Sequence, residues 1–88
     1  MENTTTSLGQ FRVGITFNPS GNERVNSIKQ KAADLIDQLE NERPIIKPDA
    51  IMSDEQARLR NEINRLISLA QTHIEDAAMW GVKAVTKS

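Results

Sequence analysis

The chain has 88 residues, of which 38% are hydrophobic, with no cysteine and a net charge of −1. This composition excludes disulfides, thiolate metal sites and a cysteine nucleophile, and it provides no overall field that would attract DNA, RNA or an anionic membrane. Without a signal-peptide pattern or a run of ~20 apolar residues, we expect one soluble domain with a small core, of a size that oligomerisation commonly stabilises.

The N-terminal segment is polar and is followed by an alternating apolar stretch. Residues 1–10 are rich in Thr, Ser and Asn and are predicted to form a disordered or extended tail. Phe11–Phe17 alternates with period two, which favours a short strand or extended arm. A single strand cannot satisfy its own backbone, so this arm should pair with another copy or lie across the helices.

The stretch Asn18–Asn22 reads Asn-Pro-Ser-Gly-Asn and joins this segment to a helix. Its Asn and Ser side chains are typical N-caps, and Pro and Gly mark the turn. The exposed N–H groups of a helix start favour an anion such as a phosphate, and Arg24 and Lys29 follow on the first two turns. The alternative is an ordinary capped helix with no ligand.

A first helix is predicted from about Asn22 to Asn41, ended by a connector that contains Pro44 and Pro48. Its apolar positions repeat with heptad spacing. They are Val25, Ile28, Ala32, Leu35 and Leu39, with Ile36 widening the stripe.

A second, longer helix is predicted from about Asp54 to Val85, opened by a possible capping box between Ser53 and Gln56. The Pro-containing connector makes the two helices an antiparallel hairpin. The apolar stripe of the second helix exceeds what its partner can cover, so we expect a homo-oligomeric helical bundle. That stripe consists of Leu59, Ile63, Leu66, Ala70, Ile74, Ala77 and Gly81.

The last turns of this helix are almost uncharged and rich in small residues. Small side chains favour a close helix contact around Ala77, Ala78 and Gly81. Trp80 either anchors such an interface or stacks on a base. Residues 11–88 are thus predicted to form a single all-α domain, a helical hairpin with a short extended N-terminal arm.

Catalytic patterns are missing from the sequence. His73 is the sole histidine, and the acidic residues lack the spacing of a metal site or a carboxylate pair. The turn also lacks the lysine of a P-loop and the dinucleotide-binding fingerprint. We therefore expect a binding protein, not an enzyme, with no cofactor and no metal.

Two motifs carry a family resemblance: F-N-P-S-G-N followed by V-x-x-I-K and A-x-L-I-D, and L-A-Q-T-H-I-E-D-A-A-M-W-G-V-K-A-V-T-K after the connector. Over about Phe11–Lys87 the chain resembles the helical-hairpin family of phage anti-CBASS proteins, cyclic-oligonucleotide sponges related to the hairpin region of Thoeris anti-defence sponges. The resemblance implies a homo-hexamer in the cytoplasm of the infected host. It would sequester cyclic GMP–AMP and other cyclic dinucleotides without cleaving them, and some members also hold cyclic trinucleotides or, in the Thoeris relatives, cyclic ADP-ribose isomers.

By the same resemblance, Phe17 corresponds to the stacking aromatic, Lys29 to the phosphate-contacting lysine and Lys83 to a basic residue of the trinucleotide pocket. The best-known members carry tyrosine at the aromatic position, so Phe17 keeps the π-face and lacks the hydroxyl. Ser20 and the N–H groups of the helix start would add hydrogen bonds, and Arg24 would assist. The complete set of candidate ligand-binding residues is Phe17, Pro19, Ser20, Arg24, Asn26, Lys29 and Lys83.

The resemblance thus implies an immune-evasion sponge, in which two copies of Phe17 and Lys29 would meet a cyclic dinucleotide of approximate two-fold symmetry. The alternative is a helical protein–protein interaction or regulatory module whose apolar seam docks another partner's helices. A small nuclease or phosphodiesterase is a third class, which the missing metal and acid–base residues disfavour.

Overall fold

Three helices make up the fold. The structure is a computed structural model that describes residues 5–47 and 51–87, in which the helices are α1 (Leu8–Val13), α2 (Glu23–Asn41) and α3 (Asp54–Val85). The described ranges contain no strand, so the predicted all-α class is confirmed. None of these helices is long and apolar enough to span a membrane.

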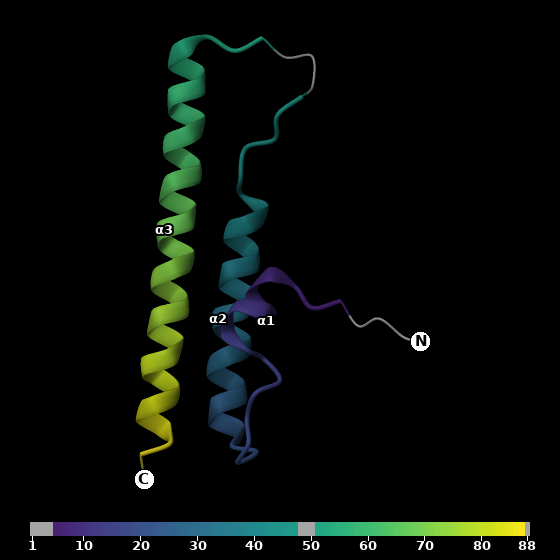
Figure 1. The fold of residues 1–88 in the computed structure, drawn as a ribbon, viewed down its shortest axis with the longest axis vertical. Coiled ribbons are helices and arrows are strands. Elements are labelled where there is room, and N and C mark those ends of the chain that lie inside the picture. Colours follow the sequence, from purple (N-terminus) through teal and green to yellow (C-terminus); the bar gives the residue numbers. More distant parts are fainter. Residues whose placement is uncertain (1–4, 48–50, 88) are drawn as a thin grey trace.

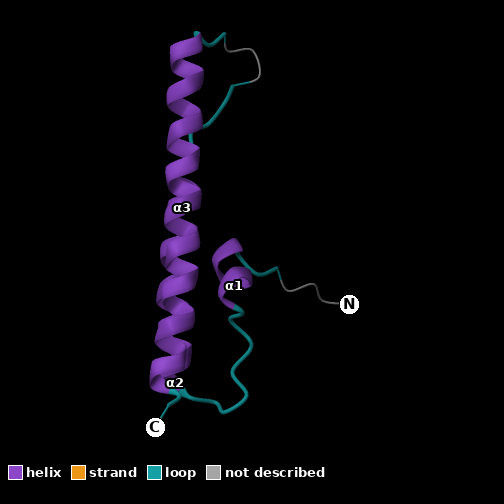
Figure 2. Ribbon diagram, turned by 60° about the vertical axis from the view of Figure 1, so that its left-hand side comes forward, coloured by secondary structure: helices purple, strands orange, loops and turns teal. Residues whose placement is uncertain are grey.

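The two long helices lie side by side and α1 stands on one face of the pair. Figure 1 shows α2 rising and α3 descending, and in Figure 2 the two overlap while α1 lies to one side. Contacts follow this arrangement, because Arg24 at the start of α2 donates to the carbonyl of Val85 at the end of α3, at 3.2 Å. Nearer the other end of α2, the Gln71 amide donates to the carbonyl of Ile36, at 3.1 Å.

The caps of the long helices explain where they begin. The Asn22 side chain accepts hydrogen bonds from the backbone N–H groups of Arg24 and Val25, so it is the N-cap of α2. Ser53 and Gln56 form the predicted capping box, each side chain bonding the other residue's backbone N–H. Both caps satisfy donors that a helix start leaves without partners, and both were readable in the sequence.

The predicted extended arm is wrong, because α1 occupies this region, from Leu8 to Val13. Ser7 and Gln10 form a second capping box, and Gly14, at φ 63°, ends the helix in the left-handed conformation. Residues 8–10, assigned to a disordered or extended tail, are therefore helical, whereas residues 1–4 of that tail lie outside the described residues.

A six-residue helix is too short to be stable alone, so docking must hold α1 in place. Gly9 provides the contact, because a Cβ built there would lie 2.7 Å from the carbonyl carbon of Ala33 on α2. The Gly9 N–H also donates to the carboxylate of Asp37, at 2.7 Å. Tertiary contact therefore overrides the strand-like alternation of the sequence.

The interior of the hairpin differs in phase from the predicted stripes. The buried residues of α2 are Val25, Lys29, Ala33 and Ile36, and those of α3 are Ile67, Gln71 and Ala78. Leu35, Leu59, Leu66 and Ala77 of the predicted stripes are exposed. Each long helix therefore has apolar residues on an exposed side as well as on its buried side. The predicted heptad positions include residues from both sides.

Candidate functional site

The loop between α1 and α2 is held by asparagine side chains. Asn18 accepts a hydrogen bond from the N–H of Asn22 at 3.2 Å, and its amide donates to the Asn22 carbonyl at 2.8 Å. The same amide donates to the side-chain oxygen of Asn26, at 2.9 Å. Gly21 adopts φ 64°, a conformation that glycine tolerates without strain. These contacts give the loop a defined shape ahead of α2.

Lys29 of α2 holds this loop against the helix through hydrogen bonds to loop carbonyls. Its side chain is only 6% exposed, and its ammonium group donates to the carbonyl of Gly14 at 2.9 Å and to the carbonyl of Phe17. The ammonium nitrogen also lies 5.5 Å from the centre of the Phe17 ring. That ring remains 71% exposed, so the loop presents an aromatic surface directly beside a buried positive charge.

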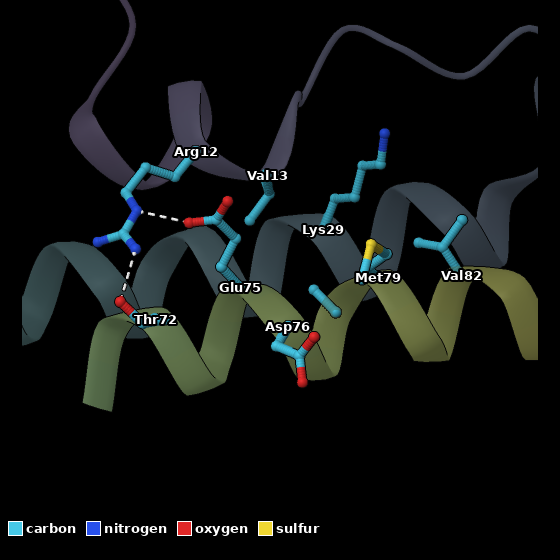
Figure 3. A pocket seen from close by; sticks show the side chains of 9 residues that line it. Arg12, Val13, Lys29, Thr72, Glu75, Asp76, Met79 and Val82 are labelled. Atoms are coloured by element: carbon cyan, nitrogen blue, oxygen red, sulfur yellow. Dashed lines mark hydrogen bonds and ion pairs between the residues drawn. The ribbon is translucent and has the colours of Figure 1, made fainter. Parts of the chain in front are cut away.

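A pocket of about 450 Å³ opens between the three helices and includes Lys29 in its wall. At one end, Arg12 of α1 pairs with Glu75 of α3 at 2.7 Å and donates to the hydroxyl of Thr72 at 3.3 Å (Figure 3). The other lining residues are Val13, Asp76, Ala78, Met79 and Val82. The volume is within the range of small-molecule sites, and the lining combines an apolar wall with a few charged groups.

Two of the predicted site residues, Phe17 and Lys29, are brought together by the fold. Pro19 and Ser20 are exposed in the same loop, and Asn26 faces it through its bond to Asn18. Arg24 reaches away from the loop, to the carbonyl of Val85.

Lys83 lies apart from this group, on the last turn of α3. Its ammonium nitrogen is 5.5 Å from the centre of the Trp80 ring. Within residues 5–47 and 51–87, no hydrogen bond joins Lys83 to the loop that carries Phe17. The predicted set therefore divides into a loop cluster and a separate residue at the C-terminal end of α3.

Sequence reasoning missed the polar end of the pocket, which consists of Arg12, Thr72 and Glu75. These residues are 60 and 63 positions apart, so no local spacing connects them. The strand prediction gave Arg12 no role. The one available signal was Ser7-Leu8-Gly9-Gln10, a capping-box pattern that would have placed Arg12 on a helix.

The described part of the chain has no group of three or more His, Cys, Asp or Glu side chains that could hold a metal ion. The pocket instead combines two cations, Arg12 and Lys29, with two carboxylates, Glu75 and Asp76. Such a lining can bond a ligand that has both hydrogen-bond donors and acceptors.

Comparison with known families gives one match. The family model described as Acb2/Tad1, hairpin domain, covers residues 8–86 and so includes all three helices. No curated protein and no solved structure matches the chain. The match begins at Leu8, the first residue of α1, so the pocket and its three walls belong to the matched region.

Proposed function

This chain belongs to the Acb2/Tad1 hairpin-domain family of anti-CBASS and anti-Thoeris sponges, and from that premise we propose that it sequesters cyclic dinucleotides such as cyclic GMP–AMP without cleaving them. The family is one of phage anti-defence proteins that bind cyclic oligonucleotides. In the infected host cell, a sponge of this kind would keep the second messenger from its CBASS effector.

The observation that carries the proposal is the Phe17 ring beside the Lys29 ammonium. A ring of a residue that is 71% exposed, on a loop held by side-chain hydrogen bonds, can stack on a nucleobase, which contributes roughly 1–3 kcal/mol per base. Stacking needs only the π-face, so phenylalanine serves as well as tyrosine. Because the carbonyl of Phe17 is fixed by Lys29, little ordering entropy is lost when the base binds.

Phosphate recognition is proposed for the same loop. The Lys29 ammonium has three donors, and two of them bond the carbonyls of Gly14 and Phe17. The third is left for a phosphate oxygen. Ser20 and Asn26 add polar groups and Pro19 shapes the turn, while Arg24 would need to release Val85 to take part.

Self-association would complete the site, and we propose a homo-oligomer of six chains. A cyclic dinucleotide has two bases and two phosphates, which two symmetry-related copies of Phe17 and Lys29 can match. The second apolar side of the hairpin, which includes Leu66 and Ala77, supplies the surface for assembly. Lys83 is proposed for a separate trinucleotide site near the C-terminal end of α3.

The test is calorimetric titration of cyclic GMP–AMP into the wild type, Phe17→Ala and Phe11→Ala. Phe11 is 76% exposed on α1 and is the matched control for loss of an exposed ring. We expect Phe17→Ala to weaken binding at least about tenfold, since stacking contributes roughly 1–3 kcal/mol per base, and Phe11→Ala to leave it unchanged. Recovery of intact ligand after denaturation would show sequestration without cleavage. If Phe17→Ala binds cyclic GMP–AMP as tightly as the wild type and Phe11→Ala do, the Phe17 site is excluded.

A second candidate is a helical protein–protein interaction module. It is favoured by the large apolar side chains exposed on the helices, among them Leu35, Leu69 and Trp80. This function would give a stoichiometric complex with a helical heteropartner and no heat of binding with cyclic dinucleotides. The titration above and a pulldown analysed for stoichiometry separate the two functions.

A further inference from the structure

The charges that line the pocket cancel, and this restricts what the pocket can hold. Arg12 and Lys29 contribute two positive charges, and Glu75 and Asp76 contribute two negative ones. A phosphate placed here would meet both carboxylates, which repel it. The pocket therefore suits a neutral group with its own donors and acceptors, and the phosphates of a ligand belong at the loop instead.

The polar end of the pocket presents a defined order of donors and acceptors. Arg12 Nε donates to one carboxylate oxygen of Glu75, at 2.7 Å, and Nη2 donates to Thr72. Within the described ranges, Nη1 of Arg12 and the second oxygen of Glu75 make no hydrogen bond. The pair thus offers a guanidinium donor next to a carboxylate acceptor, both oriented by their mutual bond (Figure 3).

Guanine matches this order and adenine does not. The Watson–Crick edge of guanine carries an acceptor, O6, followed by two donors, N1–H and the N2 amino group. O6 can accept from Arg12 while the two donors meet Glu75, and such reading of a base edge is common where a base leaves its stack. In the same placement adenine would set its N6 amino donor against the guanidinium and its N1 acceptor against the Glu75 carboxylate, so neither contact forms. Turning the base over would restore two contacts but would reverse the side on which the sugar leaves.

The remaining walls suit a planar ring. Val13, Met79 and Val82 are apolar lining residues, with Val13 beside the ion pair and Val82 furthest from it in Figure 3, and a thioether adapts to the face of an aromatic ring. Lys29 lines the pocket and also contacts Phe17, so the pocket adjoins the loop at which stacking and phosphate binding are proposed.

From this geometry we propose that the Arg12–Glu75 pair reads the base of the bound cyclic dinucleotide and selects guanine over adenine. The proposal rests on the function proposed above and specifies the ligand of that same site. Because an assembly with two symmetric sites reads both bases, affinity should decrease from cyclic di-GMP through cyclic GMP–AMP to cyclic di-AMP.

The experiment compares cyclic di-GMP, cyclic di-IMP and cyclic di-AMP by calorimetry on the wild type, Glu75→Gln and Glu62→Gln. Hypoxanthine keeps O6 and N1–H and lacks the N2 amino group, so cyclic di-IMP should bind with intermediate affinity. We expect a guanine-over-adenine preference of roughly tenfold or more per site in the wild type. Glu75→Gln should reduce the preference to below about threefold by weakening cyclic di-GMP, because one mismatched polar contact suffices to remove discrimination.

Glu62→Gln is the matched control, since Glu62 pairs with Arg65 at 2.6 Å on the same helix and does not line the pocket. It should retain the wild-type preference. Binding of cyclic di-AMP by Glu75→Gln reports that the loop site is intact. If Glu75→Gln fails to fold, Arg12→Lys replaces it. This variant removes the planar guanidinium while keeping the charge, and it should show the same loss of guanine preference.

Three outcomes would overturn the proposal. Equal affinity of the wild type for all three ligands, or an unchanged preference in Glu75→Gln or Arg12→Lys, would exclude base reading by this pair and leave the sponge function intact. No binding of any of the three ligands by the wild type would refute the cyclic dinucleotide function itself.

Discussion

The interior of the hairpin includes two buried polar side chains, whereas its uncovered side carries large apolar ones. Lys29 and Gln71, at 6% and 1% exposure, are buried between the helices. Large apolar side chains, by contrast, lie on the surface. They include Leu35, Leu59, Leu66, Leu69 and Trp80. The comparison indicates that polar contacts help to specify the fold of one chain, whereas many of its large apolar side chains stay exposed.

The buried polar groups of the interior all have partners. Gln71 donates to the carbonyl of Ile36 and to Glu40, and it accepts from Arg43 at 3.0 Å. No buried side-chain nitrogen or oxygen in the described part of the chain lacks a hydrogen bond. A shift of one helical turn between α2 and α3 would break these bonds and leave buried groups unpaired, so they fix the register of the hairpin.

The uncovered side of α3 shows the opposite chemistry. Leu59, Leu66 and Ala77 recur at multiples of about 3.6 residues, so they lie on one side of the helix. They are exposed, whereas Ile67 and Ala78 on the adjoining side are buried against α2. Exposed apolar side chains that share one side of a helix favour an interface.

Leu66→Glu tests the uncovered side and has the largest expected effect. If this side is buried between copies, an unpaired carboxylate there should cost about 3–5 kcal/mol per buried charge and dissociate the assembly. Light scattering at micromolar concentration would report monomers with unchanged helical content. Ile45→Glu, at a residue 91% exposed in the connector, is the control and should leave the assembly intact. A Leu66→Glu protein that stays fully assembled would contradict the interface.

Gly9→Ala tests the interior where α1 docks. The added methyl would lie 2.7 Å from the carbonyl carbon of Ala33, so α1 must move away from α2. We expect a loss of about 2–3 kcal/mol in the free energy of unfolding, by the usual cost of overpacking. Gly81→Ala is the matched control, because its methyl would meet Ile28 at an ordinary 3.5 Å and the helix gains by roughly 0.5–1 kcal/mol. Urea unfolding measures both, and equal stabilities would contradict the close contact.

The sequence predicted the long helices well because local signals mark their ends. Ser53 with Gln56 and Asn22 are caps that act within one turn, so they are visible without knowledge of the fold. Helix α1 was missed because the packing of Gly9 on Ala33 comes from residues 24 positions apart, and the Phe11–Phe17 alternation indicated a strand instead.

The geometry of the candidate site was predictable in part for the same reason, although the roles of its residues stay predictions. Phe17 and Lys29 flank one turn and were identified together. In the structure, the ammonium nitrogen of Lys29 lies 5.5 Å from the centre of the Phe17 ring. The burial of Lys29 was not predicted, because lysine side chains are usually exposed, whereas loop carbonyls enclose this one. The Arg12–Glu75 pair joins α1 to α3 across 63 residues, which no local pattern could reveal.

Lys29→Met tests the hydrogen bonds that join the buried lysine to the loop between α1 and α2. Methionine keeps most of the volume but leaves the carbonyls of Gly14 and Phe17 without their donor, which should cost about 1–3 kcal/mol. We expect faster hydrogen exchange across residues 14–22 and a lower free energy of unfolding. Lys31→Met, on the exposed side of the same helix, should change neither measurement. Unaltered exchange in the Lys29 variant would show that the loop is held by other contacts.

The smallest expected effect comes from the carboxyl of Glu40, which belongs to the same interior network. Hydrogen bonds from Arg43 and then from Gln71 hold its pKa below the ordinary value of 4.5. Glu40 therefore stabilises the fold at pH values above 4.5, and this stabilisation is lost as the pH falls through the lowered pKa of the folded state. Because the side chain is 41% exposed, we expect less than about 1 kcal/mol.

The measurement is the free energy of unfolding of the wild type and Glu40→Gln between pH 7 and strongly acidic pH. Glutamine keeps an acceptor for Arg43 and removes the titrating charge, so the wild type should be more stable at pH 7 and the difference should vanish in acid. Glu62, whose pKa is also lowered, by its hydrogen bond from Arg65, is present in both proteins and cancels in the comparison. A stability difference that stays constant over the whole pH range would contradict this prediction. It would mean that the charge of Glu40 does not contribute, and that Gln71 and the uncharged hydrogen bonds fix the register of the two helices.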